Sequence, residues 1–174
     1  MDVKEAIETR RAYRELEPIE VDEVLIKELA ESASLAPSCY NKQPWRFVFV
    51  KSKEKLTELW NALPRGNSWV KQGSLTVAVF TTRKLDCVIG EREYFLFDSG
   101  LASAFLILRA TELGLVAHPI AGYDESRVKE VLKIPEDMRV ITLIVIGKHR
   151  EGAEEGPRPE RLKFEEFAWI DEVK

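Results

Sequence analysis

Ten residues from Ala36 to Trp45, APSCYNKQPW, combine side chains suited to binding a flat, polar ligand. Ser38, Asn41 and Gln43 carry hydroxyl and amide groups that both donate and accept hydrogen bonds. A heterocycle with alternating N–H and C=O groups needs such neutral partners. Pro37 keeps regular structure from crossing the segment, and its Tyr and Trp rings are suited to stacking on an aromatic ligand. The alternative is a loop whose polar side chains only form turns.

A cluster of arginines, RRAYR, lies about 25 residues upstream of this loop. Arg10 and Arg14 are spaced i, i+4, so they share a face if the N-terminal helix continues that far. With Arg11 they place three guanidinium groups within five residues, and guanidinium is the preferred bidentate partner of phosphate. Loop and cluster together predict a site for a flat, polar, phosphorylated ligand. The alternative is a solvated cluster paired with nearby glutamates: Glu5, Glu8, Glu15 and Glu17.

Composition predicts one globular domain, residues 1–174, with 45% hydrophobic and 32% charged residues. The net charge of −4 argues against nucleic acid as a partner. The longest apolar run, Leu101 to Leu108, is far short of the roughly 20 residues that span a bilayer. We therefore expect no membrane association. The N-terminus resembles the start of an amphipathic helix and not a signal peptide, so the expected location is the cytoplasm.

The cysteines and histidines do not indicate a metal site. Cys39 and Cys87 are widely separated and suggest no disulfide framework. We interpret Cys39 as a small loop residue, with a reactive thiol as the alternative. His118 and His149 stand far apart without neighbours at metal-ligand spacing. The chain also lacks a P-loop and a GxGxxG motif.

Periodicity and capping residues predict alternating helices and strands. The expected helices are Val3–Arg10, one capped by Asp22 and ending near Leu35, one from Ser52 to about Leu63, Glu91–Leu113, and one capped by Asp124 and ending at Leu132. The expected strands are Arg46–Lys51, Leu75–Thr81 and Arg139–Ile146, with a loop over Pro64–Ser68. The apolar face of the second helix is assigned to Val24, Leu25, Leu29, Ala33 and Ala36. This alternation predicts a sandwich with helices on both faces of a central sheet.

The expected helix Glu91–Leu113 is apolar all round, which predicts burial on most sides. It would be roughly 35 Å long, nearly the width of a domain of this size. Small residues such as Ser99 and Gly100 permit close helix packing. We expect a dimer with this helix near the interface. The alternative is a helix buried within its own subunit.

These motifs, in this order, resemble the nitroreductase family of FMN-dependent oxidoreductases. After RRAYR and APSCYNKQPW follow RGNSWV (65–70), PIAGY (119–123), a strand ending in IGK, and PRPERLKFEEFAW (157–169). The resemblance covers Ile7 to Trp169. It implies an α+β, nitroreductase-like fold with a central mixed β-sheet flanked by helices on both faces, and a domain-exchanged homodimer whose C-terminal arms reach the partner.

The resemblance also implies which residues bind FMN. Arg10 and Arg161 match positions at the FMN phosphate, with Arg11 a weaker candidate, and Arg14 matches a cation near the pyrimidine edge. Asn67 matches an amide that bonds the pyrimidine ring. In PIAGY, Gly122 matches the glycine whose backbone N–H approaches flavin N5, and Ile120 precedes it. The matching loop residues contact an FMN held mainly by the other subunit: Pro37, Ser38 and Asn41. No metal and no catalytic side chain are implied, because FMN N5 is the reactive centre.

Two positions depart from the family pattern. Ala12 stands where members often have Ser, and Ala121 stands where some have Glu. Neither change removes FMN binding.

The implied activity is hydride transfer from NAD(P)H through flavin N5 to an electron-poor acceptor such as a nitroaromatic or a quinone. One alternative is a flavin-binding carrier or regulator without turnover. A second is a specialised variant with dehalogenating or flavin-cleaving chemistry. A third is a phosphate- or nucleotide-binding domain without flavin.

Overall fold

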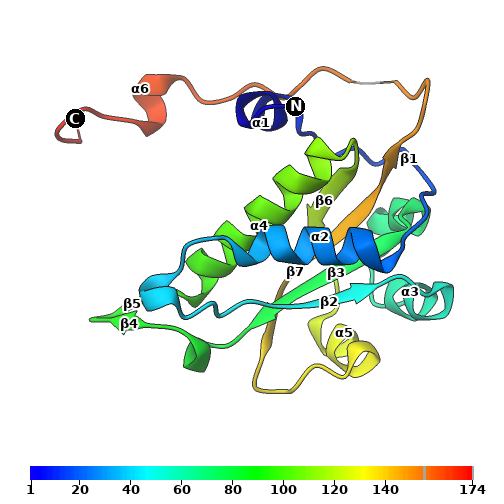
Figure 1. Cartoon of the computed structure of the whole chain (residues 1–174), viewed down its shortest axis with the longest axis horizontal. Coiled ribbons are helices and arrows are strands. Elements are labelled where there is room, and N and C mark those ends of the chain that lie inside the picture. Colours follow the sequence, from blue (N-terminus) through cyan, green and yellow to red (C-terminus); the bar gives the residue numbers. More distant parts are fainter. Residues whose placement is uncertain (155, 174) are drawn as a thin grey trace.

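The computed structural model describes residues 1–154 and 156–173 and is built around one five-stranded sheet (Figure 1). The strands are β1 (Leu16–Glu17), β2 (Arg46–Val50), β3 (Leu75–Thr81), β6 (Val116–Ile120) and β7 (Arg139–His149). β3 pairs with β2 and β7, and β7 also pairs with β6 and β1. All of these pairings are antiparallel, so the expectation of a mixed sheet is wrong. Apolar alternation has the same period in both kinds of pairing and does not distinguish them.

Helices cover both faces of the sheet, as predicted (Figure 1). Ile144 and Ile146 of β7 face a core shared with α2 (Glu23–Ser34) and α4 (Phe95–Glu112). The alternate residues Leu143 and Val145 face a second core shared with α3 and α5. These helices are Lys53–Trp60 and Glu125–Leu132. Burial on both faces explains why the central strands are continuous apolar runs.

The predicted helix starts are confirmed by their caps. The side chains of Asp22, Ser52 and Asp124 accept backbone N–H groups three residues further on. The assignment of Val24 to the apolar face of α2 is wrong. Val24 is 69% exposed, because α2 turns Leu29 to the sheet and Val24 away from it.

Three local expectations need correction. The long helix begins at Phe95, because the residues before it form a hairpin of β4 (Val88–Ile89) and β5 (Arg92–Glu93). The expected loop after Pro64 is part of η2 (Arg65–Gln72), a 3-10 helix. The strand β6 was not predicted, because Pro119 lies inside it. Proline is tolerated there because β6 pairs only with β7 and is an edge strand.

The helix α4 is buried on one side only within a single chain, and not on most sides as expected. Ala102, Leu106 and Ala110 are fully buried against the sheet. Leu96 and Phe97 remain 51% and 62% exposed. Apolar residues of the outer side therefore lie uncovered in the single chain.

The remaining helices of the described chain are α1 (Val3–Thr9), η1 (Cys39–Asn41), η3 (Arg83–Leu85) and α6 (Phe164–Phe167). Among the described residues, no helix combines the length and apolarity that crossing a bilayer requires.

Candidate functional site

The arginine cluster lies beyond the end of α1 (Val3–Thr9), so Arg10 and Arg14 do not share a helix face. The Cζ atom of Arg14 lies 5.9 Å from the ring centroid of Trp69 in η2. Arg11 lies over the ring of Tyr13 and donates a hydrogen bond to the Gly156 carbonyl at 2.7 Å. The cluster is therefore held between η2 and the C-terminal arm.

His118 connects three segments that carry predicted site residues. It lies on β6, two residues before Ile120. Its Nδ1 atom is 3.0 Å from the carbonyl oxygen of Tyr13, within the arginine cluster. Its ring centroid lies 4.4 Å from that of Trp69, which shares η2 with Asn67. The only sequence feature that indicated this role was the position of His118 next to PIAGY.

Asn67 and Gly122, which were predicted to belong to one site, are in direct contact. The Asn67 Nδ2 atom donates to the Gly122 carbonyl at 2.8 Å. A Cβ atom on Gly122 would lie 3.0 Å from that nitrogen and 3.6 Å from Cγ of Pro64. Glycine is thus the residue that fits beside the amide, and its backbone is exposed. The Ile120 side chain is buried in the core, so only its backbone could serve a ligand.

Within the described residues, the glutamates considered as partners do not neutralise Arg10 or Arg14. Glu8 pairs with Lys4, Glu15 with Arg150 and Glu17 with Lys148. Across residues 1–154 and 156–173, no carboxylate forms an ion pair with Arg10 or Arg14. The buried Nε1 of Trp69 also has no hydrogen-bond partner in that part of the chain. Two cations without a carboxylate partner among the described residues, Arg10 and Arg14, suit an anionic ligand.

The same surroundings shift the titration of His118. Burial lowers the pKa of His118, and the charges of Arg14 and Arg10 lower it further, while the hydrogen bond with the Tyr13 carbonyl opposes them. At neutral pH the ring is therefore uncharged. The proton on Nδ1 then serves the Tyr13 carbonyl.

We expect the lowered pKa of His118 to make stability pH-dependent. Because the folded pKa lies below the ordinary value of 6.5, the unfolded chain takes up the proton first. The free energy of unfolding should fall as the pH drops below 6.5 and level off below the folded pKa. Thermal melts from pH 7.5 to 5 should show a flatter dependence for His118→Gln than for the wild type. His149→Gln, which removes the other histidine, is melted alongside for comparison. An unchanged slope in His118→Gln would contradict the assignment.

The loop with Pro37, Ser38 and Asn41 lies at the other end of α4 from the arginine cluster (Figure 1). The backbone N–H of Cys39 donates to Asp98 in the first turn of α4 at 2.7 Å. The helix α1 instead lines a cavity with Arg109 and neighbours in the last turns of α4. Asp98 and Arg109 are eleven residues apart on this helix, which corresponds to roughly 16 Å along its axis. One chain therefore does not bring the two predicted parts of the site together.

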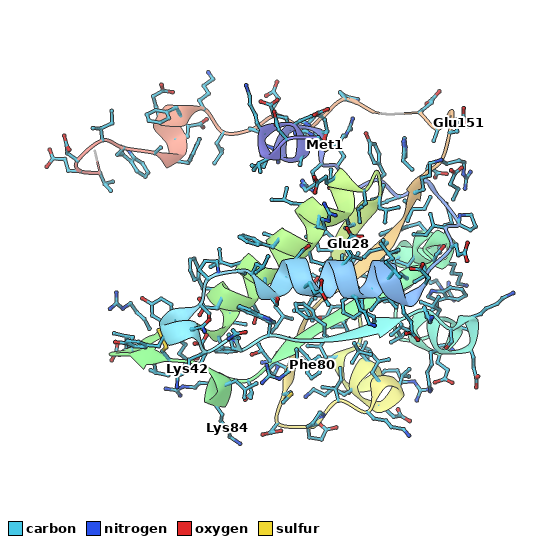
Figure 2. The ribbon with its side chains drawn as sticks, in the orientation of Figure 1. Met1, Glu28, Lys42, Phe80, Lys84 and Glu151 are labelled. Carbon is cyan, nitrogen blue, oxygen red and sulfur yellow. A yellow bond between two sulfur atoms is a disulfide. The ribbon has the colours of Figure 1, made fainter. Side chains whose placement is uncertain are left out.

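Cys39 forms a disulfide with Cys87, with the Cα atoms 6.1 Å apart. Figure 2 shows the bond in yellow near Lys42. The interpretation of Cys39 as an unpaired residue is wrong. The chain passes through β2, α3 and β3 and returns to the loop only at η3, so a separation of 48 residues gave no hint of the contact.

The C-terminal arm runs along α1 and then away from the sheet (Figure 1). Arg158 reaches the cluster, where its Nη2 atom donates to the carbonyl oxygens of Arg10, at 3.1 Å, and Glu8. Sequence reasoning missed Arg158. The predicted phosphate ligand Arg161 lies further along the arm and is exposed. Within one chain, the arm contacts the cluster through Gly156 and Arg158.

Two cavities lie near η2. One of about 270 Å³ is lined by Asn67, Trp60, Arg65 and Lys71, among others. Another of about 520 Å³ lies between the start of β3 and α3 and contains none of the predicted site residues. Only the smaller one adjoins the Asn67–Gly122 contact.

The sheet, its two helical layers and this arrangement of motifs are those of a nitroreductase. Residues 7–148 match the family model described as "Nitroreductase family", and the chain belongs to this family.

Its relatives come from both archaea and bacteria. A protein of Methanothermobacter thermautotrophicus, provisionally named an NADH dehydrogenase/NAD(P)H nitroreductase, is 30% identical, and the match covers 96% of this chain and 88% of the relative. A nitroreductase family protein of Streptococcus pneumoniae is 27% identical over 97% of this chain and 100% of its own, with a TM-score of 0.83. A structure from Exiguobacterium sibiricum, solved in complex with FMN, is 24% identical over 98% of both chains and has the same fold, with a TM-score of 0.88.

Proposed function

We propose that this protein is an FMN-dependent oxidoreductase that uses NAD(P)H to reduce an electron-poor acceptor such as a nitroaromatic or a quinone. The observation that carries the proposal is that Arg10 and Arg14, which form no ion pair among the described residues, lie near the Asn67–Gly122 contact. Membership of the nitroreductase family supports it. So do the name of the Methanothermobacter relative and the FMN bound by the Exiguobacterium protein.

The residues present fit the phosphate of FMN. Arg10 and Arg14 have no carboxylate partner among the described residues, and the arm brings Arg158 to the same place. Arg11 is already engaged with the arm through Gly156, so its contribution is to fix that segment. The phosphate of FMN would be the counter-ion of these guanidinium groups, in the role that a carboxylate has in an ordinary ion pair.

The residues around Gly122 fit a planar heterocycle. The Asn67 amide offers a donor and an acceptor, and Gly122 leaves the backbone uncovered for close approach. When bound, FMN would supply the hydride chemistry, as cofactors do in such enzymes. The protein would supply position and charge: Arg14 provides a fixed cation near the ring, and a fixed cation stabilises negative charge that develops during reduction.

A complete site in this proposal requires a homodimer. The arginine cluster and Asn67 come from one chain, whereas Pro37, Ser38 and Asn41 lie at the far end of α4. A second copy could bring its own loop to the cluster. The uncovered apolar side of α4 and the extended arm are the surfaces that would bury against it.

An anaerobic titration tests the proposed function. Purified protein supplemented with FMN is titrated with NADH and then NADPH while the visible band of bound flavin is followed. Bleaching at stoichiometric reductant is the expected result, and reoxidation by a nitroaromatic or a quinone should follow. A bound flavin that stays oxidised would favour a carrier or regulator. A protein that rejects FMN would contradict the proposal.

A further inference from the structure

The disulfide Cys39–Cys87 fastens the candidate cofactor loop to the rest of the fold. Cys39 lies between Ser38 and Asn41 of the predicted site, and Cys87 lies between η3 and β4. Both cysteines are half-buried, and the neighbouring Tyr40 is 81% exposed. The bond is therefore placed near the surface, where a small thiol reagent can approach it.

The loop backbone adopts a conformation that its residues disfavour. Tyr40, Asn41 and Gln43 have φ angles of 47°, 56° and 49°, and none of them is glycine. A Cβ atom makes this left-handed region unfavourable, and such residues persist where surrounding contacts fix them. The shape of the loop therefore depends on its anchors.

Few anchors hold the loop besides the disulfide. The N–H of Cys39 donates to Asp98, and the N–H of Gln43 donates to Ser38 Oγ at 3.0 Å. Thr81 Oγ1 donates to the carbonyl of Pro44 at 2.9 Å, where the chain leaves the loop. In the described chain the disulfide is the one covalent link between the loop and the segment before α4. Breaking it leaves the left-handed residues held only by hydrogen bonds and by the buried ends of the loop, Ala36 and Trp45.

We propose that Cys39–Cys87 is a redox-sensitive modification site, and that its reduction by a dithiol releases the loop and weakens FMN binding. The proposal rests on the proposed function, because it assigns the loop to the FMN site of the partner subunit. A donor thiolate attacks one sulfur, the S–S bond breaks, and the other cysteine leaves as a thiolate. The second donor thiol resolves the mixed disulfide. Two electrons and two protons pass to Cys39 and Cys87, and the donor ends as a disulfide.

The test compares oxidised and reduced protein. Dithiothreitol is the dithiol, and it is removed by anaerobic gel filtration before measurement. The count of free thiols should rise from none to two per chain. Hydrogen exchange of residues 36–45 should accelerate on reduction, and the Kd for FMN should rise about tenfold, the factor that corresponds to 1.4 kcal/mol.

Cys87→Ser separates loss of the bond from other effects of the reductant. Cys87 is not among the proposed FMN ligands, and its variant should show the weakened Kd with or without dithiothreitol. Its circular dichroism spectrum and melting curve report whether it folds. Reduced wild type gives the same information without a substitution.

Each outcome bears on the proposal. Equal FMN affinity and equal exchange in both states, after two thiols have been counted, would overturn it. Two free thiols in protein treated with oxidised glutathione would also overturn it, since the bond would then not form. If the oxidised protein does not bind FMN, the proposed function fails. Independently of FMN, hydrogen exchange of the loop that stays the same after reduction would contradict the release of the loop.

Discussion

Two variants that each fail to bind FMN should together restore about half of the sites in a heterodimer. The first carries Arg10→Glu and Arg14→Glu, which repel the phosphate. The second carries Ser38→Tyr, which fills the loop. Because a site in the proposed dimer takes its cluster from one chain and its loop from the other, one of the two sites in the heterodimer has both parts intact. Heterodimers isolated by two affinity tags are titrated with FMN, with absorbance as the readout.

The homodimers of each variant, carried through the same tagging, are the control and should stay empty. Each should still melt cooperatively, since the changed side chains lie outside both cores. FMN bound normally by the Ser38→Tyr homodimer would remove the loop from the site. An empty heterodimer beside a wild type that binds FMN would contradict the shared site.

Replacing Gly122 by valine should weaken FMN binding by about 30-fold, equivalent to ~2 kcal/mol. A Cβ atom there already lies 3.0 Å from Asn67 Nδ2, and the branched side chain must displace the amide or cover the backbone. Both routes disturb the groups proposed to hold the ring. Isothermal titration of the variant with FMN measures the loss.

Gly66→Ala is the matched control for this substitution. It changes a glycine immediately before Asn67, in the same 3-10 helix, but its Cβ atom would meet nothing within 4 Å. We expect FMN affinity within about twofold of wild type, as for a surface change without new contacts. Equal losses in both variants would show that η2 is merely sensitive to substitution, and would contradict the specific role of Gly122.

Helices and strands were predicted well where a capping residue or a run of apolar residues marked them. Asp22, Ser52 and Asp124 marked helix starts, and the apolar run Leu75–Thr81 marked a strand with the bounds observed. Side-chain alternation does not carry strand direction, so the sheet was expected to be mixed and is antiparallel. The strand β6 was not predicted, because proline is unusual in strands and Pro119 lies among its apolar residues.

For the candidate site, sequence motifs identified segments better than they identified contacts. Asn67 and Gly122, 55 positions apart and assigned to one site, are in contact. His118 and Arg158 were missed, because their roles arise from where β6 and the arm cross the arginine cluster. The bond between Cys39 and Cys87 was missed for the same reason. Contacts between distant segments depend on topology, which a single sequence does not display.

The distance along α4 between the arginine cluster and the loop has a consequence for assembly. A ligand held by one part from each of two chains binds the pair and not the separate protomers. By mass action such a ligand strengthens the association of the chains that hold it. FMN would then stabilise the dimer in addition to serving as the redox group. The fraction of chains in dimers would rise with FMN supply, and dilution of the protein would release cofactor and partner together.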